Sequence, residues 1–514
     1  MSFVSRRRLA VGAVALASVV ALSTACGGDP SSATDRDLTI VLATPPVSLD
    51  PCDTQDAANA QILRSNVLES LTRIDPESGD VEPLLAESWE GSDDNRTWTF
   101  TLKQGVEFHD GEPFDADAVS TSIDRVINSD IGCGNGTEDF FPYDLTIDVV
   151  DDTTVKVTSA EPDGIFPLRM TYVDLASPAT PVDEKTRQPV GTGPYTLSEV
   201  VDGESITIEP FVDYWGDAPD ASSVKYVYRT EATVRASMIK TGEADLAVPI
   251  SAADATDDDR TREYSDNRVF FLRTQTNKAP FDDARVREAV HYAIDRGTIT
   301  EALMDHSGES YDQIVAPTVN AYIDGYEGPS FDPDHAKQLL DAAEEDGTDV
   351  SATVELVTRP DLFPGSDEVM QAITQNLQDV GFTIKLRSID TDPWLQLLRK
   401  PYPAEQTPNI IAISHDNISG DASFTYPKYV SSNGANSTLQ NDEIDALIAK
   451  AEMETGESRA ATYQEASRLL YEEEFTLVPV ALQTKLLMLG TGIEYEPNGL
   501  TGVELRIGDI TFTD

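Results

Sequence analysis

Segments with helical spacing and segments with strand spacing alternate along this chain from residue 38 onward, joined by short connections. Residues 331–347 show the helical type most clearly, with Asp332 at the cap, Pro333 at the first helical position and Gly347 after the end. Residues 366–390 read as a capped helix, a glycine and then an alternating strand. An alternation of this kind predicts an α/β fold.

Two further segments have patterns that predict their local structure. Residues 57–75 keep helical spacing through Ile62, Val67 and Leu71, which predicts a helix. Residues 256–268, TDDDRTREYSDNR, are almost all charged or polar and predict a surface loop.

The length and charge of the chain limit its architecture and its partners. With 514 residues it is too long for one compact core, so we expect two or three domains. Its 91 acidic residues against 37 basic residues give a formal net charge of −54, which repels nucleic acid and anionic lipid headgroups. The acids are spread over the whole length, so they indicate a solvated surface rather than one site that attracts cations.

Residues 1–25 have the parts of a secretory signal peptide: a basic start, an apolar run and small residues before a cut. The run is short for a spanning helix. The sequence LSTAC ends at Cys26 and resembles a bacterial lipoprotein box, with Ser23 where such boxes usually carry Leu. The resemblance implies that Cys26 becomes the lipidated N-terminus, followed by a flexible tether, so that residues 26–36 form the membrane attachment. The alternative is a secreted protein with an unused cysteine, and SRRRLA also resembles a twin-arginine signal.

Cys52 and Cys133 are the two other cysteines of the chain. An even pair outside the cytoplasm predicts a disulfide. Two isolated thiols do not make a zinc site. The hypothesis is therefore a Cys52–Cys133 bond.

The charge-rich segment KAPFDDARVREAVHYAIDR, residues 278–296, has the spacing of an amphipathic helix. A helix over residues 283–294 places its apolar residues on one face. Asp282 and Asp283 fall at its N-terminal end, where carboxylates cap free N–H groups. The other charges are expected on the solvent side, and His291 is expected to be structural. The segment therefore predicts a scaffold helix rather than an active site.

The same segment carries a family resemblance. Extended to residues 277–296, it resembles the signature of the large extracytoplasmic solute-binding proteins of peptide and nickel ABC importers, solute-binding family 5. Other similar segments follow in the order expected for the family: residues 85–119, GTGPY at 191–195, DYWGDAP at 213–219, IKTGEADL at 239–246 and LVPV at 477–480. Each segment alone is a weak signal, but the ordered set is specific.

The resemblance implies a two-lobed α/β fold of the type II periplasmic-binding-protein class, with an extra subdomain and a hinge. Lobe I is expected from residues 37–50, 190–270 and 478–514, the extra subdomain from residues 51–189, and lobe II from residues 271–477. The ligand is expected in the cleft between the lobes. The resemblance further implies a monomer without a cofactor, anchored by lipid to the outer face of the cell membrane. Its permease and ATPase partners would be separate chains.

The family's peptide binders place an Asp in a segment resembling W-x-x-D-N, where it takes the ammonium group of the peptide. Residues 413–424, ISHDNISGDASF, match it with Asp416 and Asn417. Ile413 stands at the aromatic position of that motif, and Ala481 and Leu482 stand where aromatics often follow VPV. At both places the chain departs from the pattern of the peptide binders. The alternative for Asp416 is an Asx turn.

Two more carboxylates are candidates for contact with the ligand. Asp421 is a second candidate for the amine contact. Asp56 is the best charged candidate in residues 52–56, CDTQD, which resemble the family's first ligand-facing loop.

Non-peptide ligands and enzymatic activity are the alternatives. Opines, oligosaccharides and nickel chelates use this scaffold in relatives. Of the five histidines only His415 lies near the expected cleft, and none has metal-ligand spacing, so we predict no metal site. A secreted hydrolase is the remote alternative, because the sequence holds no G-x-S-x-G elbow, no H-E-x-x-H and no P-loop.

Overall fold

The computed structural model describes residues 36–513, apart from residues 77, 137–139, 257–259, 305, 361, 404–405, 418, 498 and 501–503. The expected signal peptide and Cys26 lie outside the described residues, as does the tether up to residue 35. Within the described part, no helix combines the length and the apolar character that crossing a membrane requires. Lobe I, the extra subdomain and lobe II denote the residue ranges predicted from the sequence, and the limits of these ranges stay predictions.

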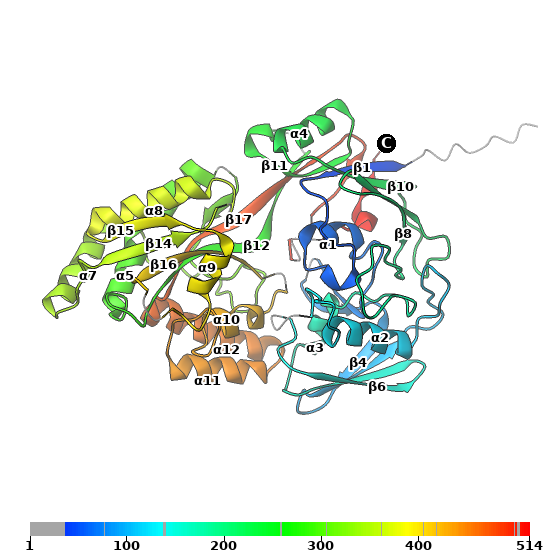
Figure 1. The fold of residues 1–514 in the computed structure, drawn as a ribbon, viewed down its shortest axis with the longest axis horizontal. Coiled ribbons are helices and arrows are strands. Elements are labelled where there is room, and N and C mark those ends of the chain that lie inside the picture. The colour runs from blue at the N-terminus through cyan, green and yellow to red at the C-terminus, as the bar shows by residue number, and fades with distance from the viewer. Residues whose placement is uncertain are drawn as a thin grey trace, which may run out of the picture. The chain divides into compact units, whose positions relative to one another are not determined.

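One mixed sheet runs through both lobes (Figure 1). Its strands follow the order β15-β14-β16-β12-β17-β11-β1-β10-β9-β8, and β13 pairs with β17 at the side. Their bounds are β1 (Asp37–Leu42), β8 (Tyr195–Val201), β9 (Ser205–Pro210), β10 (Ser223–Tyr228), β11 (Leu246–Ile250), β12 (Thr261–Thr274), β13 (Gly308–Ser310), β14 (Thr353–Thr358), β15 (Thr383–Ser388), β16 (Asn409–Asp416) and β17 (Leu477–Leu489). The pair β18 (Ile493–Glu494) and β19 (Thr511–Phe512) lies near the C-terminal end.

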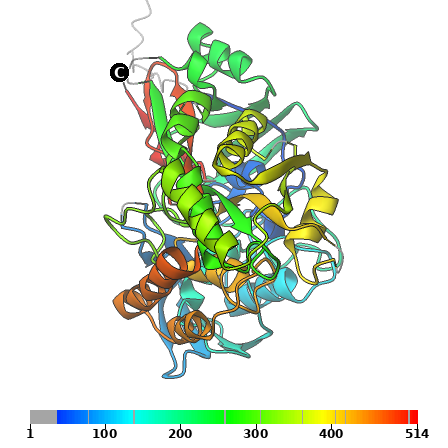
Figure 2. The same ribbon diagram turned by 90° about the vertical axis from the view of Figure 1, so that its left-hand side faces the viewer.

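Helices cover both faces of the sheet in lobe II. Alternate residues of β12 and β16 point to opposite faces, so Phe270 and Ile410 pack in one core and Phe271 and Ile411 in another. Helices α5, α7 and α8 cover the first face, and α9, α11 and α12 the second; Figure 2 shows α11 and α12 in orange, apart from the green α5 and α7. The bounds of the helices outside the extra subdomain are α4 (Ala232–Thr241), α5 (Ala284–Ala293), α6 (Arg296–Ile299), α7 (Pro333–Glu345), α8 (Ser366–Val380), α9 (Thr391–Leu398), α10 (Tyr426–Tyr429), α11 (Asp442–Glu452) and α12 (Gly456–Leu469).

The extra subdomain has its own antiparallel sheet in the order β4-β5-β7-β6. Its alternating strand β5 buries Trp98, Phe100 and Leu102 in a separate core beneath α2. The bounds of its elements are α1 (Ala57–Leu63), β2 (Thr72–Ile74), β3 (Val81–Pro83), β4 (Ala86–Gly91), β5 (Thr97–Leu102), α2 (Ala116–Ile127), β6 (Leu145–Asp151), β7 (Thr154–Ser159) and α3 (Phe166–Arg169).

Strands β12 and β17 connect the two parts of the large sheet. They pair with one another, while β17 also pairs with β11 of lobe I and β12 with β16 of lobe II. The expectation of a surface loop over residues 256–268 is therefore wrong from Thr261 onward, because β12 begins there. The polar residues of this segment form a strand because the apolar strand β17 provides a hydrogen-bonding partner, a tertiary effect that overrides propensity.

The scaffold helix expected over residues 283–294 is confirmed as α5, with the Asp283 side chain accepting a hydrogen bond from the N–H of Arg285. His291 is buried, and burial together with the nearby Arg296 lowers its pKa to about 3. The expectation that the other charges face solvent is wrong for Arg287 and Arg296, which are buried. Both can be buried because their guanidinium groups donate to backbone carbonyls, such as those of Glu474 and Pro479.

The helix expected over residues 57–75 is shorter than its pattern suggested. Helix α1 ends at Leu63, the chain turns at Ser65 with a φ of 62°, and β2 follows from Thr72. Val67 is nevertheless buried, because it packs in the lobe I core from a non-helical segment. Apolar spacing alone does not separate a helix from a folded loop whose side chains enter the same core.

The GTGPY and DYWGDAP segments converge on one buried carboxylate. Glu69 accepts hydrogen bonds from Thr192 Oγ1 at 2.8 Å, Tyr214 Oη at 2.9 Å and Trp215 Nε1 at 2.8 Å. Burial raises the pKa of Glu69. A Cβ on Gly191 would lie 2.1 Å from the carbonyl oxygen of Val67, so this position requires glycine. These two family segments therefore join lobe I to the extra subdomain.

Cys52 and Cys133 form a disulfide in the structure. It connects the short 3-10 helix at Pro51–Asp53 with the segment after α2. Asn135 lies beside it, donating its N–H to the carbonyl of Cys52 at 3.0 Å and accepting from the N–H of Gln55 at 2.8 Å. The 52–56 segment is thus fixed by both the covalent bond and hydrogen bonds.

Candidate ligand site

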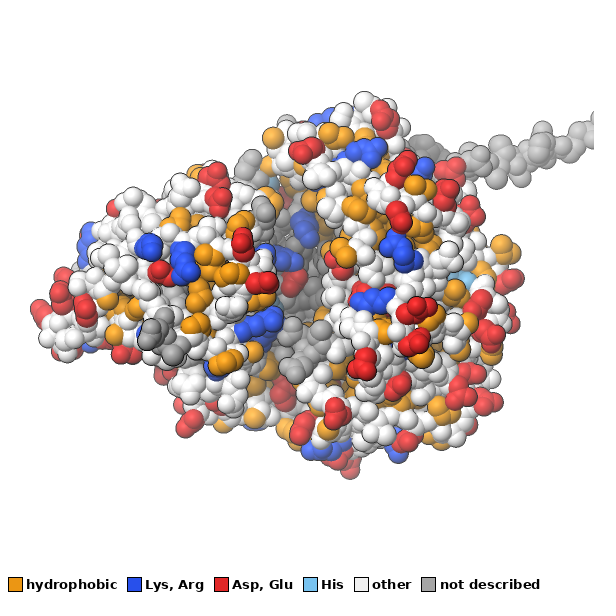
Figure 3. Space-filling view, viewed as in Figure 1, with side chains coloured by type: hydrophobic (Ala, Val, Ile, Leu, Met, Phe, Trp, Pro, Cys, Tyr) orange, Lys and Arg blue, Asp and Glu red, His pale blue; other side chains and the backbone are white. Residues whose placement is uncertain are grey.

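Asp416 is the last residue of β16 and lies opposite Arg268 of β12 in the antiparallel register. Arg268 Nη2 is 2.6 Å from Asp416 Oδ2. The Asp416 side chain is 40% exposed and that of Arg268 is 32% exposed, so solvent reaches this ion pair. The space-filling view shows a hollow between the two lobes with Lys and Arg side chains along its walls (Figure 3).

The carboxyl end of β16 lies on the side of lobe II that borders the extra subdomain. Phe424, eight residues further along, contacts Phe140 and Tyr172 of that subdomain. Burial raises the pKa of Tyr172, and the negative charge of Asp416 adds to the rise. Asp416 and Tyr172 therefore lie near one another across the boundary between lobe II and the extra subdomain.

The charge of Asp416 persists at neutral pH. Burial opposes ionisation, but the positive charge of Arg268 outweighs it and holds the pKa of Asp416 below its ordinary value. An ionised, partly exposed carboxylate is the group that a ligand ammonium requires for a charge-assisted hydrogen bond.

Asn417 is buried and folds the loop that follows Asp416. Its Nδ2 donates to the carbonyl of Asp421 at 2.8 Å and to Thr425 Oγ1 at 3.0 Å, and its Oδ1 accepts from Ser419 Oγ at 2.9 Å. The N–H of Ser419 also donates to Asn417 Oδ1 at 3.3 Å, so the Asx turn that the sequence suggested as an alternative for Asp416 is formed by Asn417. The structure thus gives Asn417 internal partners on both sides of its amide.

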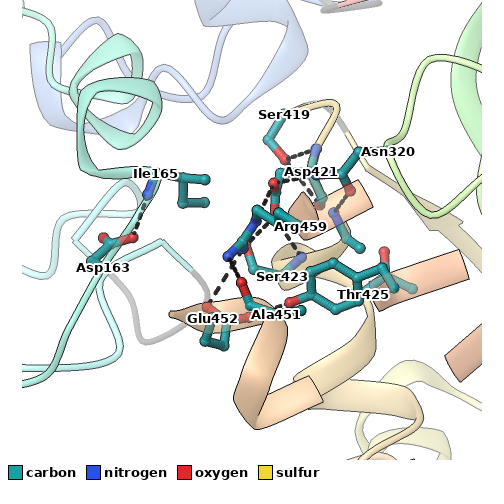
Figure 4. A network of polar contacts seen from close by, with 12 residues as sticks. Asp163, Ile165, Asn320, Ser419, Asp421, Ser423, Thr425, Ala451, Glu452 and Arg459 are labelled. Atoms are coloured by element: carbon teal, nitrogen blue, oxygen red, sulfur yellow. Dashed lines mark hydrogen bonds and ion pairs between the residues drawn. The ribbon is translucent and has the colours of Figure 1, made fainter. Parts of the chain in front are cut away.

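Asp421 is also engaged within lobe II (Figure 4). Arg459 Nε and Nη2 donate to its two carboxylate oxygens at 2.8 Å and 2.7 Å, and Asn320 Nδ2 donates at 2.6 Å. Burial of Asp421 opposes ionisation, but the Arg459 guanidinium outweighs it and lowers the pKa to about 2. Arg459 is 1% exposed, so the ion pair is closed to solvent.

His415 and Asp56 have local partners. His415 Nε2 is 2.9 Å from Thr425 Oγ1, and its ring contacts Tyr429 at 4.7 Å between centroids. Asp56 caps α1 by accepting from the N–H of Asn59 at 3.2 Å. Both side chains are only partly buried.

Two residues of this region were not predicted from the sequence. Arg268 fell in the segment expected to be a loop, and its pairing with Asp416 depends on a strand register that residue types do not specify. Tyr172 lies far from Asp416 in sequence and in no recognised motif. Partners on a neighbouring strand or on the other lobe could therefore be identified only from the three-dimensional structure.

Cavities among the described residues lie beside Tyr172 and at the far end of β12. A polar pocket beside Tyr172 is lined by Arg64, Thr171 and Glu504, among others. A cavity of about 490 Å³ lies instead at the far end of β12, lined by Lys400, Tyr402 and neighbours. The second cavity is at the opposite end of β16 from Asp416, so it is separate from the candidate site.

The described residues contain no group of three or more His, Cys, Asp or Glu side chains arranged to hold a metal ion.

Comparisons with known proteins give the family. The sequence model of the family described as "Bacterial extracellular solute-binding proteins, family 5 Middle" matches residues 80–437. Heme-binding protein A of Haemophilus influenzae is 27% identical over 488 residues, covering 88% of each chain. Glutathione-binding protein GsiB of Salmonella paratyphi A is 27% identical over 460 residues, covering 85% of this chain and 87% of the relative.

A solved structure supports the fold. The structure of HbpA2 from Haemophilus parasuis superposes with a TM-score of 0.79 at 22% identity, covering 93% of this chain and 100% of that one. The family matched by the model consists of solute-binding proteins rather than hydrolases, so the hydrolase alternative is set aside. The match over more than half of the sequence shows that the chain belongs to the bacterial extracellular solute-binding proteins of family 5, which serve as the substrate-binding proteins of ABC importers.

Proposed function

We propose that this protein captures a small peptide with a free amino terminus between its lobes and delivers it to the membrane permease of an ABC importer. The observation that carries the proposal is the ionised, partly exposed carboxylate of Asp416 at the end of β16. Asp416 would accept the ligand ammonium, and Arg268 would keep the carboxylate oriented and charged.

The other candidate residues have different proposed roles. Asn417 and Asp421 would position the loop rather than touch the ligand, because their polar atoms already have internal partners. His415 and Asp56 stay predicted ligand contacts, since both are only partly buried.

A non-peptide ligand is the second candidate. Of the two curated relatives above, one is named for glutathione and one for heme. Glutathione is itself a peptide with an ammonium group, which suits Asp416. A ligand with carboxylates and no ammonium, such as heme or a carboxylate chelate of nickel, would instead meet Arg268. An opine carries carboxylates and a secondary ammonium group, so it would meet both Arg268 and Asp416. An oligosaccharide would need neither charge.

We also propose that residues 1–25 are a cleaved signal peptide and that lipidated Cys26 holds the protein, as a monomer, at the outer face of the cell membrane. The support is the basic, apolar and small-residue order before Cys26. A Cys26→Ser variant should appear in the soluble fraction, and a membrane-bound variant would contradict the anchor.

The test of the ligand is native mass spectrometry of gently purified protein. A set of bound peptide masses that disappears on denaturation would support the proposal. Asp416→Asn should weaken binding by about 2 kcal/mol or more, at least roughly 30-fold, because the ligand ammonium loses its charged partner. Asp341→Asn, a change of the same kind on the exposed side of α7, is the matched control. A single non-peptide mass would overturn the peptide assignment.

A further inference from the structure

Phe424 of lobe II touches the extra subdomain through an aromatic cluster. Its ring centroid lies 5.6 Å from that of Phe140 and 5.8 Å from that of Tyr172, and the Arg169 guanidinium lies 5.3 Å from it. We call Phe424, Phe140, Arg169 and Tyr172 the interlobe clasp. Aromatic pairs and a guanidinium over a ring are attractive at these separations.

The subdomain side of the clasp is held in place. Arg169 Nε donates to Asp163 Oδ2 at 2.7 Å, and Arg169 Nη1 donates to the carbonyl of Phe140 at 2.7 Å. The rings of Phe140 and Tyr172 are 5.0 Å apart. The receptor surface for Phe424 is therefore fixed by contacts within the subdomain.

The lobe II side is fixed by the buried ion pair. Asp421 caps the short 3-10 helix Ala422–Phe424 by accepting from the N–H of Ser423 at 2.8 Å, and Arg459 anchors Asp421. Figure 4 shows this network on the lobe II side, with Asp163 and Ile165 of the subdomain opposite. Phe424 is thus presented by a segment whose residues Asp421 and Ser423 are held by hydrogen bonds within lobe II.

Two more contacts cross the same boundary. Asn95 Nδ2 donates to the carbonyl of Met453 at 3.3 Å. A Cβ on Gly164 would lie 2.7 Å from the carbonyl oxygen of Glu454 and 3.0 Å from Thr455 Cγ2. The subdomain therefore approaches lobe II so closely that Gly164 has no room for a side chain.

We infer that Phe424 determines ligand affinity by holding lobe II against the extra subdomain before any ligand arrives. When only a fraction of a binding protein is in the closed state that binds tightly, its apparent affinity is the affinity of that state multiplied by the fraction. The clasp raises the fraction of molecules in the closed state. Phe424, which provides this effect, is distinct from Asp416, the proposed amine acceptor. The affinity part of this inference rests on the proposed function, whereas the closure part does not.

The first test needs no ligand. Small-angle X-ray scattering of ligand-free protein should show a larger radius of gyration for Phe424→Ala than for wild type. Phe424→Tyr keeps the ring and should behave as wild type. Phe331→Ala removes a phenyl ring from an exposed site before α7 and is the matched control. An unchanged radius for a folded Phe424→Ala protein would overturn the inference.

A second variant approaches the contact from the other side. Gly164→Ala places a methyl group against the Glu454 carbonyl and should also increase the radius. This variant decides the question if Phe424→Ala does not fold, as judged by circular dichroism; a wild-type radius would then overturn the inference.

The affinity test uses whichever ligand native mass spectrometry finds. Phe424→Ala should bind it roughly tenfold more weakly, the loss expected for an aromatic cluster of this kind. Phe424→Tyr should restore the affinity. An increased radius with unchanged affinity would overturn the affinity role and leave Asp416 as amine acceptor untouched. An increased radius in a protein that binds no peptide would overturn the proposed function alone.

Discussion

Arg459 and Asp421 form a buried ion pair, and its importance for stability follows from the effect of removing one partner. Removing one partner leaves the other as an uncompensated buried charge. The resulting loss of stability is far larger than the stability that an exposed ion pair contributes. The pair fixes the loop that separates Asp416 from Phe424. Asp421, which the sequence suggested as a ligand contact, therefore orders the residues around it.

The pH dependence of stability should reveal this pair. Because the pKa of Asp421 is lowered to about 2 in the folded protein, the ionised carboxylate stabilises the fold above pH ~4, and this contribution is lost as the pH falls towards 2. We expect Asp421→Asn to destabilise most above pH ~4, with the difference from wild type shrinking by about 2 kcal/mol as the pH approaches 2. Urea unfolding of the two proteins across this range measures it.

The control for that measurement is Asp341→Asn, whose difference from wild type should stay small at every pH because Asp341 is exposed. A destabilisation by Asp421→Asn that does not change with pH would mean that Asp421 is not charged in the folded protein.

At the scale of elements, local signals decided which predictions succeeded. Helix α7 begins at Pro333, has Asp332 as its N-cap and is followed by Gly347 with a φ of 100°, so residues at its own ends specify where it starts and stops. Helix α1 has Asp56 as a cap at its start, but no glycine or proline marks its end at Leu63, and strand β12 has no comparable local signal. Their extents depend on what they pack against: the lobe I core for Val67, and β17 for Thr261 onward.

The candidate site divides in the same way. Asp416 was identifiable because a family motif surrounds it. Its partner Arg268 was not, because which residue lies opposite another in a sheet depends on the register. The clasp was not identifiable either, since Phe424 and Tyr172 meet only when lobe II and the extra subdomain are in place.

The disulfide should be a major stabiliser of the extra subdomain. It joins cysteines 81 positions apart, so it removes many conformations from the unfolded chain. Replacing both cysteines, with Cys52→Ser and Cys133→Ser, should lower the free energy of unfolding by roughly 4 kcal/mol. Urea unfolding of the double variant and of wild type, both unreduced, gives the difference.

The covalent bond itself needs a separate check. The unreduced wild-type mass should rise by two hydrogens for this pair on reduction, and no such rise should occur in the double variant. A wild-type protein in which Cys52 and Cys133 both react with a thiol reagent before reduction would contradict the disulfide.

Net charge is the dominant property of the molecule as a whole. At −54, the folded chain repels itself, and compaction brings the acidic side chains closer than they are in the unfolded state. Surface ion pairs act in the opposite sense and weaken with salt, but each contributes less than about 1 kcal/mol. Repulsion should therefore dominate the response of this protein to ionic strength.

We expect the melting temperature to rise with sodium chloride and most of the rise to occur early, because the Debye length is already about 10 Å at 0.1 M salt and about 3 Å at 1 M. Differential scanning calorimetry over this range measures it. Sodium and potassium chloride should give equal shifts at equal ionic strength, since screening depends on charge rather than on ion identity. A melting temperature that stays flat at low salt and then rises steadily would instead indicate preferential exclusion of salt from the surface. A fall would show that attractive ion pairs outweigh repulsion, despite the excess of acidic residues.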